Sequence, residues 1–118
     1  MKRVVVTGIG VMTPIGKNIP AYNDALKNGK SGASGITLFD ASVFKTQFAC
    51  EVKDFDPNEY MDRKVARRMD RFSQFAMASA KEAMTDAGLI DAKFNPERAG
   101  VIWASGIGGL RSLEVDIE

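Results

Sequence analysis

The segment DRFSQFAMASAKEAMTDAG, residues 70–88, constrains the fold of this chain more than any other stretch. Alanine recurs along it at spacings of four, three and four residues, and a glycine closes it, which is typical of an α-helix. Because alanine projects only a methyl group, such a stripe allows the helix to lie close against a flat surface or a second helix. The sequence therefore predicts a helix with a tightly packed neighbour. The stripe and its flanking residues are Ala76, Ala80, Ala83, Ala87, Phe72, Met84 and Gly88.

Two runs of β-branched and apolar residues predict buried strands that end in glycine turns. RVVVTGIG occupies residues 3–10, and AGVIWAS occupies residues 99–105 before a second glycine-rich turn. Helix signals lie between them: Asn18 is a predicted N-cap, and Gly29 is a predicted stop. The order of strands and helices, with the strand described next, predicts an α/β or mixed layered fold.

A third strand is predicted over residues 46–52, TQFACEV. Phe48, Cys50 and Val52 alternate with other residues and would share one buried side of this strand. The preceding residues 31–42 are rich in glycine and serine and are predicted as loop.

Two further helices are predicted near the middle and the end of the chain. Asp56 and Pro57 form a cap and first-turn pair for a short helix. The last residues, LRSLEVDIE, resemble the opening turns of another helix. Acidic side chains stabilise a helix start and disfavour a helix end, so Glu114, Asp116 and Glu118 suit a helix that continues. We therefore expect a chain that is cut short at Glu118.

The composition argues against several classes of function. The chain has 16 Lys and Arg against 15 Asp and Glu, and a formal net charge of +1 disfavours a general nucleic-acid binder. It has no histidine, the commonest metal ligand and the commonest proton-transfer group near neutral pH. The single cysteine excludes an intrachain disulfide, and the apolar runs are too short to span a membrane or to form a secretory signal. We expect a cytoplasmic protein with no metal and with neither a nucleic-acid nor a membrane partner.

Two features that resemble functional sites, a cysteine and a glycine-containing turn, are expected to have structural roles. Cys50 would need a base or a cationic helix end to become a reactive thiolate, and we expect it instead in the core, on the buried side of its strand. The turn GIGVMT, residues 8–13, resembles a dinucleotide fingerprint. However, Thr13 stands where the third glycine is needed, and Pro14 follows where the helix should run. A packed turn is therefore expected there.

The second glycine-rich loop, ASGIGGL at residues 104–110, has two interpretations that stay open. Such loops expose backbone N–H groups that bind anions or allow a ligand close to the backbone. They also occur because a turn needs a positive φ or tight packing. Ile107 is the one large apolar side chain among these glycines, and it suits projection into a cavity.

The stretch DRKVARRMDR, residues 62–71, gathers positive charge in a chain that is otherwise nearly neutral. In a helix the cations would form two ladders at four-residue spacing, which cost about 0.2–0.5 kcal/mol for each like-charged pair. A solvated face neutralised by acids elsewhere is one interpretation, and a docking patch for an acidic surface is the other. The predominance of arginine favours recognition of carboxylate or phosphate. We call this set the basic cluster: Arg63, Lys64, Arg67, Arg68 and Arg71.

Taken together and in this order, these motifs resemble the N-terminal part of the elongating β-ketoacyl-acyl-carrier-protein synthases of bacterial fatty acid synthesis, most closely the 3-oxoacyl synthase II type. The matching stretches, which cover nearly the whole chain, are RVVVTGIGVMTPIG, GKSGASGITLFD, EVKDFDPNEYMDRKVARRMDRFSQFAMASAKEAM and IWASGIGGL. The resemblance implies that residues 1–118 are part of the synthase N-terminal domain. It also implies a thiolase-like α/β fold of five layers, αβαβα, which is incomplete in this chain.

The resemblance implies a partner for the basic cluster. Lys64, Arg67 and Arg68 match the positions that contact the acidic recognition helix of acyl carrier protein, and the other two cations would add supporting charge. Ile107 matches an isoleucine at the acyl pocket, near the dimer interface, that influences which chain lengths enter. A homodimer and a carrier protein bearing acyl or malonyl groups are the implied partners.

The implied reaction is acyl transfer to a cysteine, followed by decarboxylative Claisen condensation with malonyl carrier, without a metal or organic cofactor. Its cysteine and two histidines belong to later motifs, so no residue of this chain is assigned a catalytic role, and Cys50 does not match the nucleophile. Two alternatives stay open. One is a polyketide-type ketosynthase or a chain-length factor, which would differ beyond Glu118. The other is a non-catalytic module that binds an acidic partner protein.

Overall fold

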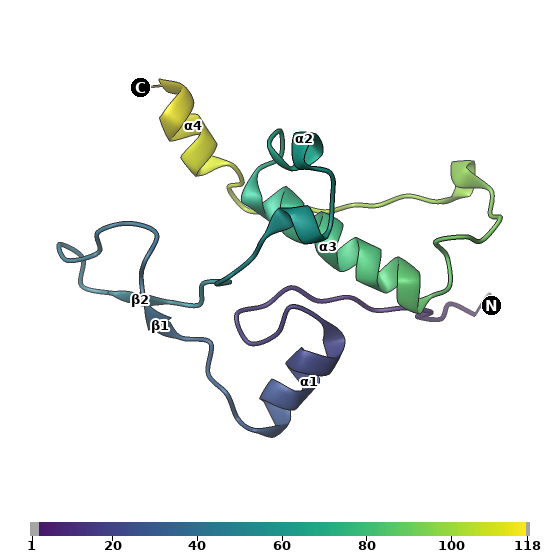
Figure 1. Ribbon diagram of the computed structural model, residues 1–118, viewed down its shortest axis with the longest axis horizontal. Helices are drawn as coiled ribbons and strands as arrows, with labels where there is room; N and C mark the ends of the chain where they lie inside the picture. Colours follow the sequence, from purple (N-terminus) through teal and green to yellow (C-terminus); the bar gives the residue numbers. More distant parts are fainter. Residues whose placement is uncertain (1–2, 118) are drawn as a thin grey trace. The chain divides into compact units, whose positions relative to one another are not determined.

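The computed structural model describes residues 3–117, and the chain divides into two compact units. One unit comprises residues 1–10 and 56–118, and the other comprises residues 11–55. Figure 1 shows the helices and strands of the described chain. In chain order they are α1 (Ile19–Lys27), β1 (Ser34–Gly35), β2 (Phe48–Ala49), the 3-10 helix η1 (Pro57–Glu59), α2 (Arg63–Ala66), α3 (Arg71–Asp86), the 3-10 helix η2 (Pro96–Arg98) and α4 (Leu110–Ile117).

Helix α1 begins and ends as the sequence predicts. The Asn18 side chain accepts a hydrogen bond of 2.9 Å from the backbone N–H of Ala21, so it satisfies one of the unpaired donors of the first turn. Proline occupies that turn, where its missing N–H costs no hydrogen bond. Beyond the last turn Gly29 takes a positive φ of 61°. The predicted N-cap and stop are both confirmed.

The sheet of the second unit is smaller than predicted. β1 and β2 pair antiparallel over two residues each, with Ser34 opposite Ala49 and Gly35 opposite Phe48. β1 therefore lies inside a segment that was predicted as loop. The predicted buried side of residues 46–52 is wrong, because Phe48 is 64% exposed and Cys50 is exposed. Alternation shows which side chains share a face, but it does not show whether another element covers that face.

Helix α3 has the close neighbour that its small residues predict. The extended residues 3–10 run along it in the same unit (Figure 1). A Cβ atom at Gly8 would lie 2.8 Å from the Ala87 Cβ, and one at Gly10 would lie 2.0 Å from the Ser79 carbonyl oxygen. The two glycines therefore permit an approach that any side chain would prevent. After the helix ends, Gly88 takes a positive φ of 67°.

The two predicted buried strands at residues 3–10 and 99–105 do not form in the described residues. Both segments lack strand pairing, and their side chains are open to solvent: Val4 is 93% exposed and Ile102 is 98% exposed. The physical reason is that a strand is held by a hydrogen-bonded neighbour, and a β-branched run does not specify one. The prediction of two buried strands is therefore wrong for this chain.

The remaining helices follow the predicted signals in shorter form. Asp56 caps a 3-10 turn, accepting a hydrogen bond of 2.9 Å from the Asn58 N–H, and a separate helix, α2, follows. α4 occupies the predicted C-terminal position, while Glu118 lies outside the described residues. Within residues 3–117 no helix combines the length and the apolar character needed to cross a membrane. The buried side chains there are small, namely Ala25, Ala41, Ala66, Ala78 and Ser79.

Candidate functional site

The basic cluster is divided between two helices rather than placed on one. α2 ends at Ala66, with Arg67 as its C-cap residue in helical geometry. Asp70 then adopts an extended conformation and begins α3. The predicted ladder of Arg63, Arg67 and Arg71 is therefore wrong, because only its first two members share a helical turn. In that turn the Arg67 backbone N–H donates a hydrogen bond of 3.2 Å to the Arg63 carbonyl oxygen.

The two acidic residues beside the cluster are used elsewhere. Asp62 is the N-cap of α2, and its carboxylate accepts a hydrogen bond of 2.7 Å from the Lys64 backbone N–H. The Asp70 carboxylate accepts a hydrogen bond from the Ser112 hydroxyl. Both carboxylates therefore serve local structure, and within residues 3–117 neither forms an ion pair with Arg63, Lys64, Arg67 or Arg68.

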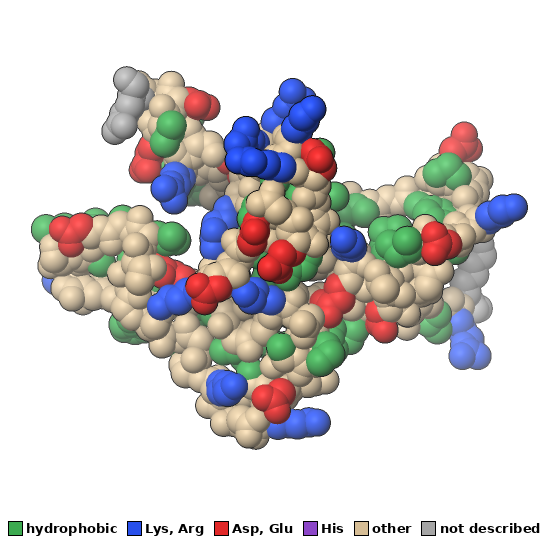
Figure 2. All heavy atoms as spheres, viewed as in Figure 1, with side chains coloured by type: hydrophobic (Ala, Val, Ile, Leu, Met, Phe, Trp, Pro, Cys, Tyr) green, Lys and Arg blue, Asp and Glu red, His purple; other side chains and the backbone are tan. Residues whose placement is uncertain are grey.

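Four cations of the cluster form an exposed positive surface. Arg63, Lys64, Arg67 and Arg68 are all exposed, and within residues 3–117 no carboxylate pairs with their side chains. Figure 2 shows blue side chains gathered over α2. Concentrated positive charge without internal partners attracts an anionic surface and raises its rate of association. Of the two interpretations of the cluster, this arrangement favours the docking patch.

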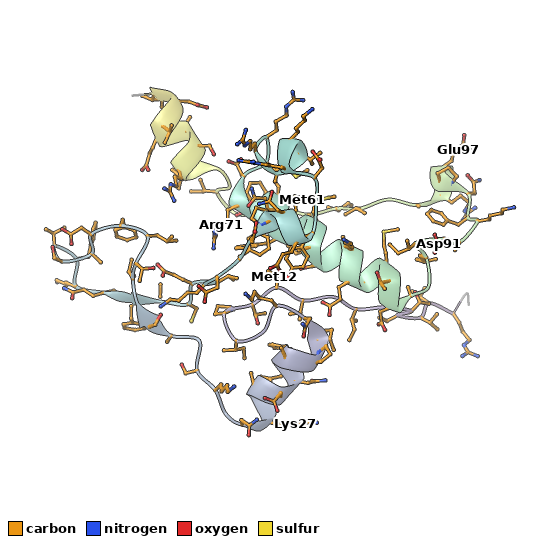
Figure 3. The ribbon with its side chains drawn as sticks, in the orientation of Figure 1. Met12, Lys27, Met61, Arg71, Asp91 and Glu97 are labelled. Carbon is orange, nitrogen blue, oxygen red and sulfur yellow. The ribbon has the colours of Figure 1, made fainter. Side chains whose placement is uncertain are left out.

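Arg71 stands apart from the other four. It is the first residue of α3, and Figure 3 shows its side chain at that end of the helix. Its guanidinium carbon lies 5.1 Å from the centroid of the Phe75 ring, within the range of a cation–π contact. Arg71 therefore has a role in local packing, and the exposed positive surface comprises the other four cations.

Gln74 links the end of α2 to the first turn of α3, and sequence reasoning missed it. Its side-chain amide donates hydrogen bonds of 2.9 Å to the Ala66 carbonyl oxygen and 3.2 Å to the Met69 carbonyl oxygen. These carbonyls lie at and just beyond the end of α2, and the Ala66 carbonyl oxygen also accepts a hydrogen bond of 3.2 Å from the Met69 N–H. The amide thus holds the residues that carry Arg67 and Arg68 against the start of α3.

The glycine-rich loop packs against the same end of α3. Gly109 has a positive φ of 73°, and a Cβ atom there would lie 2.7 Å from Asp70 Oδ2. A Cβ atom at Gly108 would lie 2.6 Å from the Phe72 ring. The sequence offered two structural reasons for glycine in this loop, a positive φ and tight packing. Both are present here.

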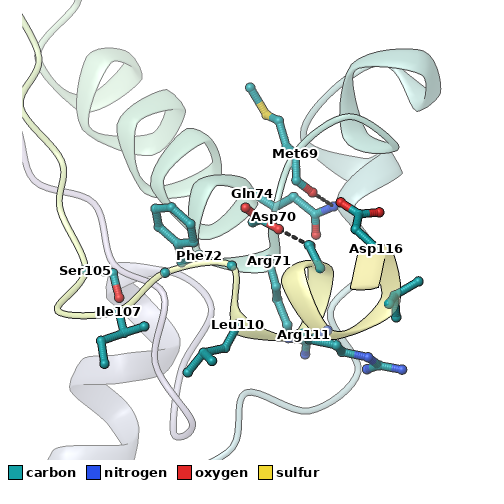
Figure 4. Close-up of a pocket in the computed structure, with 14 residues that line it drawn as sticks. Met69, Asp70, Arg71, Phe72, Gln74, Ser105, Ile107, Leu110, Arg111 and Asp116 are labelled. Carbon is teal, nitrogen blue, oxygen red and sulfur yellow. Dashed lines mark hydrogen bonds between the residues drawn. The ribbon is translucent and has the colours of Figure 1, made fainter. Parts of the chain in front are cut away.

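Ile107 lies beside an open pocket of about 520 Å³. The pocket is formed by the start of α3, the glycine-rich loop and α4, and its apolar lining includes Phe72, Leu110 and Val115. The Ile107 side chain is 75% exposed, and in Figure 4 it projects from the loop on the side away from Phe72. An exposed isoleucine at a pocket rim can restrict what enters, and the role of Ile107 at an acyl pocket stays a prediction.

The second unit contains a further open pocket, of about 500 Å³. On its rim Lys17 Nζ donates a hydrogen bond of 2.5 Å to the Asp54 carbonyl oxygen, and Glu51 is held by the Thr37 segment. Hydrogen bonds from the Thr37 hydroxyl and backbone N–H lower the pKa of Glu51 below its usual 4.5. These groups are engaged with the protein itself. Among residues 3–117, no three His, Cys, Asp or Glu side chains are grouped so as to hold a metal ion.

Comparisons with known proteins identify the family. The family model for the β-ketoacyl synthase N-terminal domain matches residues 1–117. The chain is 48% identical over 113 residues to the 3-oxoacyl-[acyl-carrier-protein] synthase 2 of Synechocystis sp., covering 96% of this chain and 27% of that protein. It is also 43% identical over 116 residues to a putative polyketide β-ketoacyl synthase of Streptomyces cyaneus, covering 98% of this chain and 27% of that one. The chain thus spans about a quarter of the length of these relatives.

A solved structure gives the fold class. The ishigamide ketosynthase/chain length factor matches with a TM-score of 0.68 and 41% sequence identity, over 74% of this chain and 22% of its own. The predicted thiolase-like α/β class is thereby confirmed, and residues 3–117 form a mixed α/β part of it. Because the family model matches nearly all of this chain, the chain belongs to the β-ketoacyl synthase family.

Proposed function

We propose that this chain is the N-terminal part of the N-terminal domain of an elongating 3-oxoacyl-acyl-carrier-protein synthase. Its reaction would lengthen fatty acyl chains: an acyl thioester condenses with malonyl carrier, carbon dioxide leaves, and a new carbon–carbon bond forms. The relatives named 3-oxoacyl-[acyl-carrier-protein] synthase 2 support this function. Large apolar side chains left exposed at residues 3–10 and 99–105 support a longer protein that covers them.

The observation that carries the proposal is the exposed positive surface on and after α2. Lys64, Arg67 and Arg68 are exposed and have no carboxylate partner among the described residues. An acidic helix of acyl carrier protein is an occupant with complementary charge, and arginine can bind its carboxylates in a bidentate manner. We assign carrier-protein docking to these three residues, with Arg63 adding charge beside them.

Ile107 is proposed as a wall of the acyl pocket. Its exposed apolar side chain at the pocket rim is suited to contact a hydrocarbon chain and to limit the space available to it. The resemblance to synthase II implies that the nucleophilic cysteine and the two histidines belong to parts of the synthase outside these residues, and this chain contains no histidine. This chain contributes docking and chain selection.

The test is elongation by the full-length synthase that contains this chain. Purified enzyme is mixed with acyl carrier protein that bears short or long acyl groups and with malonyl carrier, and products are identified by mass spectrometry. The proposal predicts a 3-oxoacyl product two carbons longer than the primer, together with carbon dioxide. Absence of any condensation with an active carrier and primer would contradict the enzymatic assignment.

A polyketide-type ketosynthase or a chain-length factor is the second candidate. It is favoured by the Streptomyces cyaneus relative and by the ishigamide ketosynthase/chain length factor. The same assay separates the candidates, because a polyketide ketosynthase would extend its product repeatedly without reduction of the keto groups. A chain-length factor would condense nothing alone. A homodimer and a cytoplasmic location are further parts of the proposal and rest on the resemblance to synthase II.

A further inference from the structure

We propose that Asp70 is a positioning residue that sets the chain-length selectivity of the synthase by holding the glycine-rich loop. The loop carries Ile107, so this inference rests on the proposed function of that residue. Asp70 also lines the pocket beside Ile107, and its proposed role is to hold the loop rather than to bind the acyl chain. It acts through Ser112 and Gly109, which lie on either side of the start of α4.

The Asp70 side chain does not perform the usual task of an N-cap residue. An N-cap aspartate normally accepts a hydrogen bond from the second or third backbone N–H of its own helix. Asp70 occupies the N-cap position of α3, yet no such side-chain bond forms. Its carboxylate instead accepts a hydrogen bond from the Ser112 hydroxyl on α4 (Figure 4). A bond to a charged acceptor across 42 positions of sequence thus replaces a local cap.

The same carboxylate also confines the loop sterically. Asp70 Oδ2 lies 2.7 Å from the position of a Cβ atom at Gly109, and the Phe72 ring lies 2.6 Å from that of a Cβ at Gly108. Two side chains from the start of α3 therefore pack against two consecutive glycines. Ile107 directly precedes these glycines, so the direction in which it projects depends on where α3 holds them.

The start of α3 is bonded both to the segment that carries the docking surface and to α4, which follows the glycine-rich loop. The Gln74 amide ties the Ala66 and Met69 carbonyl oxygens to the start of α3, and Arg67 and Arg68 lie between those two residues. Asp70 follows directly and holds the loop. A carrier bound at the arginines would thus deliver its acyl chain to a rim whose position relative to the docking surface is fixed by Asp70.

Loss of this contact should release the loop while Ile107 itself is left unchanged. In the full-length synthase we expect Asp70→Ala and Ser112→Ala each to move the ratio of kcat/KM for long and short primers toward one, by about threefold to tenfold. The double variant should show no further change, because both substitutions remove one interaction. Ser112→Thr keeps the hydroxyl donor and should restore the wild-type ratio. Glu114→Gln, a change of an exposed acid on the same helix, should not alter it.

A ratio separates positioning from a merely structural role. Partial unfolding lowers the rate with every primer by the same factor, so an unchanged ratio in Asp70→Ala and Ser112→Ala would overturn the proposal. Additive effects in the double variant, or failure of Ser112→Thr to restore the ratio, would overturn it as well. If only Asp70→Ala fails to fold, the two Ser112 variants still decide the outcome.

Hydrogen–deuterium exchange tests the contact independently of activity. Backbone amides of residues 105–112 in the full-length protein should exchange faster in Asp70→Ala and Ser112→Ala than in wild type, and at the wild-type rate in Ser112→Thr. Unchanged exchange in both alanine variants would overturn the proposal even for an active enzyme. An enzyme that condenses nothing but shows the predicted exchange would instead contradict the proposed function and leave the positioning contact in place.

Discussion

The backbone N–H of Ile9 donates a hydrogen bond of 3.0 Å to Asp86 Oδ2 and so joins the extended residues 3–10 to the last residue of α3. Gly8 and Gly10, on either side of Ile9, bring the backbone of this segment against the helix. The contact depends on the absence of side chains, which makes it sensitive to a single methyl group.

Gly10→Ala should therefore destabilise the protein. The added Cβ would lie 2.0 Å from the Ser79 carbonyl oxygen, and a backbone atom cannot move aside as a flexible side chain can. Overpacking of this kind lowers the free energy of unfolding by about 1–3 kcal/mol. Urea denaturation of the full-length protein measures the loss. Gly100→Ala is the matched control, because a Cβ there meets nothing within 4 Å. Equal stability of the two variants would contradict the contact.

Asn18→Ala should weaken α1. The substitution removes the 2.9 Å hydrogen bond to the Ala21 N–H and leaves that donor without its cap. Loss of such a cap lowers the free energy of unfolding by about 1 kcal/mol. Asn23→Ala, in the interior of the same helix, is the control and should be neutral or slightly stabilising because alanine is the better helix former. The prediction fails if Asn18→Ala unfolds at the same denaturant concentration as Asn23→Ala.

Glu51 should contribute stability that disappears in acid. Hydrogen bonds from Thr37 lower its pKa in the folded state, so the folded protein binds this proton less readily than the unfolded chain does. The contribution is therefore fully present above the usual pKa of 4.5 and is lost as the pH falls through the lowered value. The difference in unfolding free energy between wild type and Glu51→Gln should shrink as the pH is lowered below 4.5. A difference independent of pH would contradict this role, and Glu97→Gln serves as the control.

The elements that the sequence predicted well are those with local signals. The N-cap Asn18, the stop at Gly29 and the end of α3 before Gly88 each depend on residues within one helical turn. A cap bond or a positive φ is decided by the residue itself and its nearest neighbours in sequence.

The predictions that failed concern features that depend on contacts between residues distant in sequence. Residues 99–105 have the composition of a buried strand, but no described segment pairs with them. Residues 46–52 alternate as a half-buried strand does, but Cys50 on the predicted buried side is exposed. The Asp70–Ser112 contact spans 42 positions, and no local pattern indicates it. The break between α2 and α3 could have been anticipated, because aspartate at position 70 is a favoured N-cap residue that precedes the alanine-rich helix.

Ile107→Phe should alter chain-length preference if Ile107 limits the pocket. The larger ring would occupy space at the rim and exclude long primers more than short ones. We expect the ratio of kcat/KM for long and short primers to fall by about tenfold or more, in line with the effect of one or two methylene groups in an apolar pocket. Steady-state rates with acyl carrier proteins of several chain lengths provide the measurement. Unchanged rates across short and long primers would remove Ile107 from the acyl pocket.

The central claim, that Lys64, Arg67 and Arg68 dock the carrier protein, is tested by the binding affinity of acyl carrier protein for a charge-reversed full-length synthase. The variant changes all three residues to glutamate, and the control variant makes the same change in net charge at the exposed residues Lys30, Lys45 and Lys93. At low salt the docking variant should bind the carrier at least about tenfold more weakly than wild type, and its affinity should depend less on ionic strength. Equal affinities for the wild-type protein and the docking variant at low salt, or equal losses in both variants, would contradict the claim.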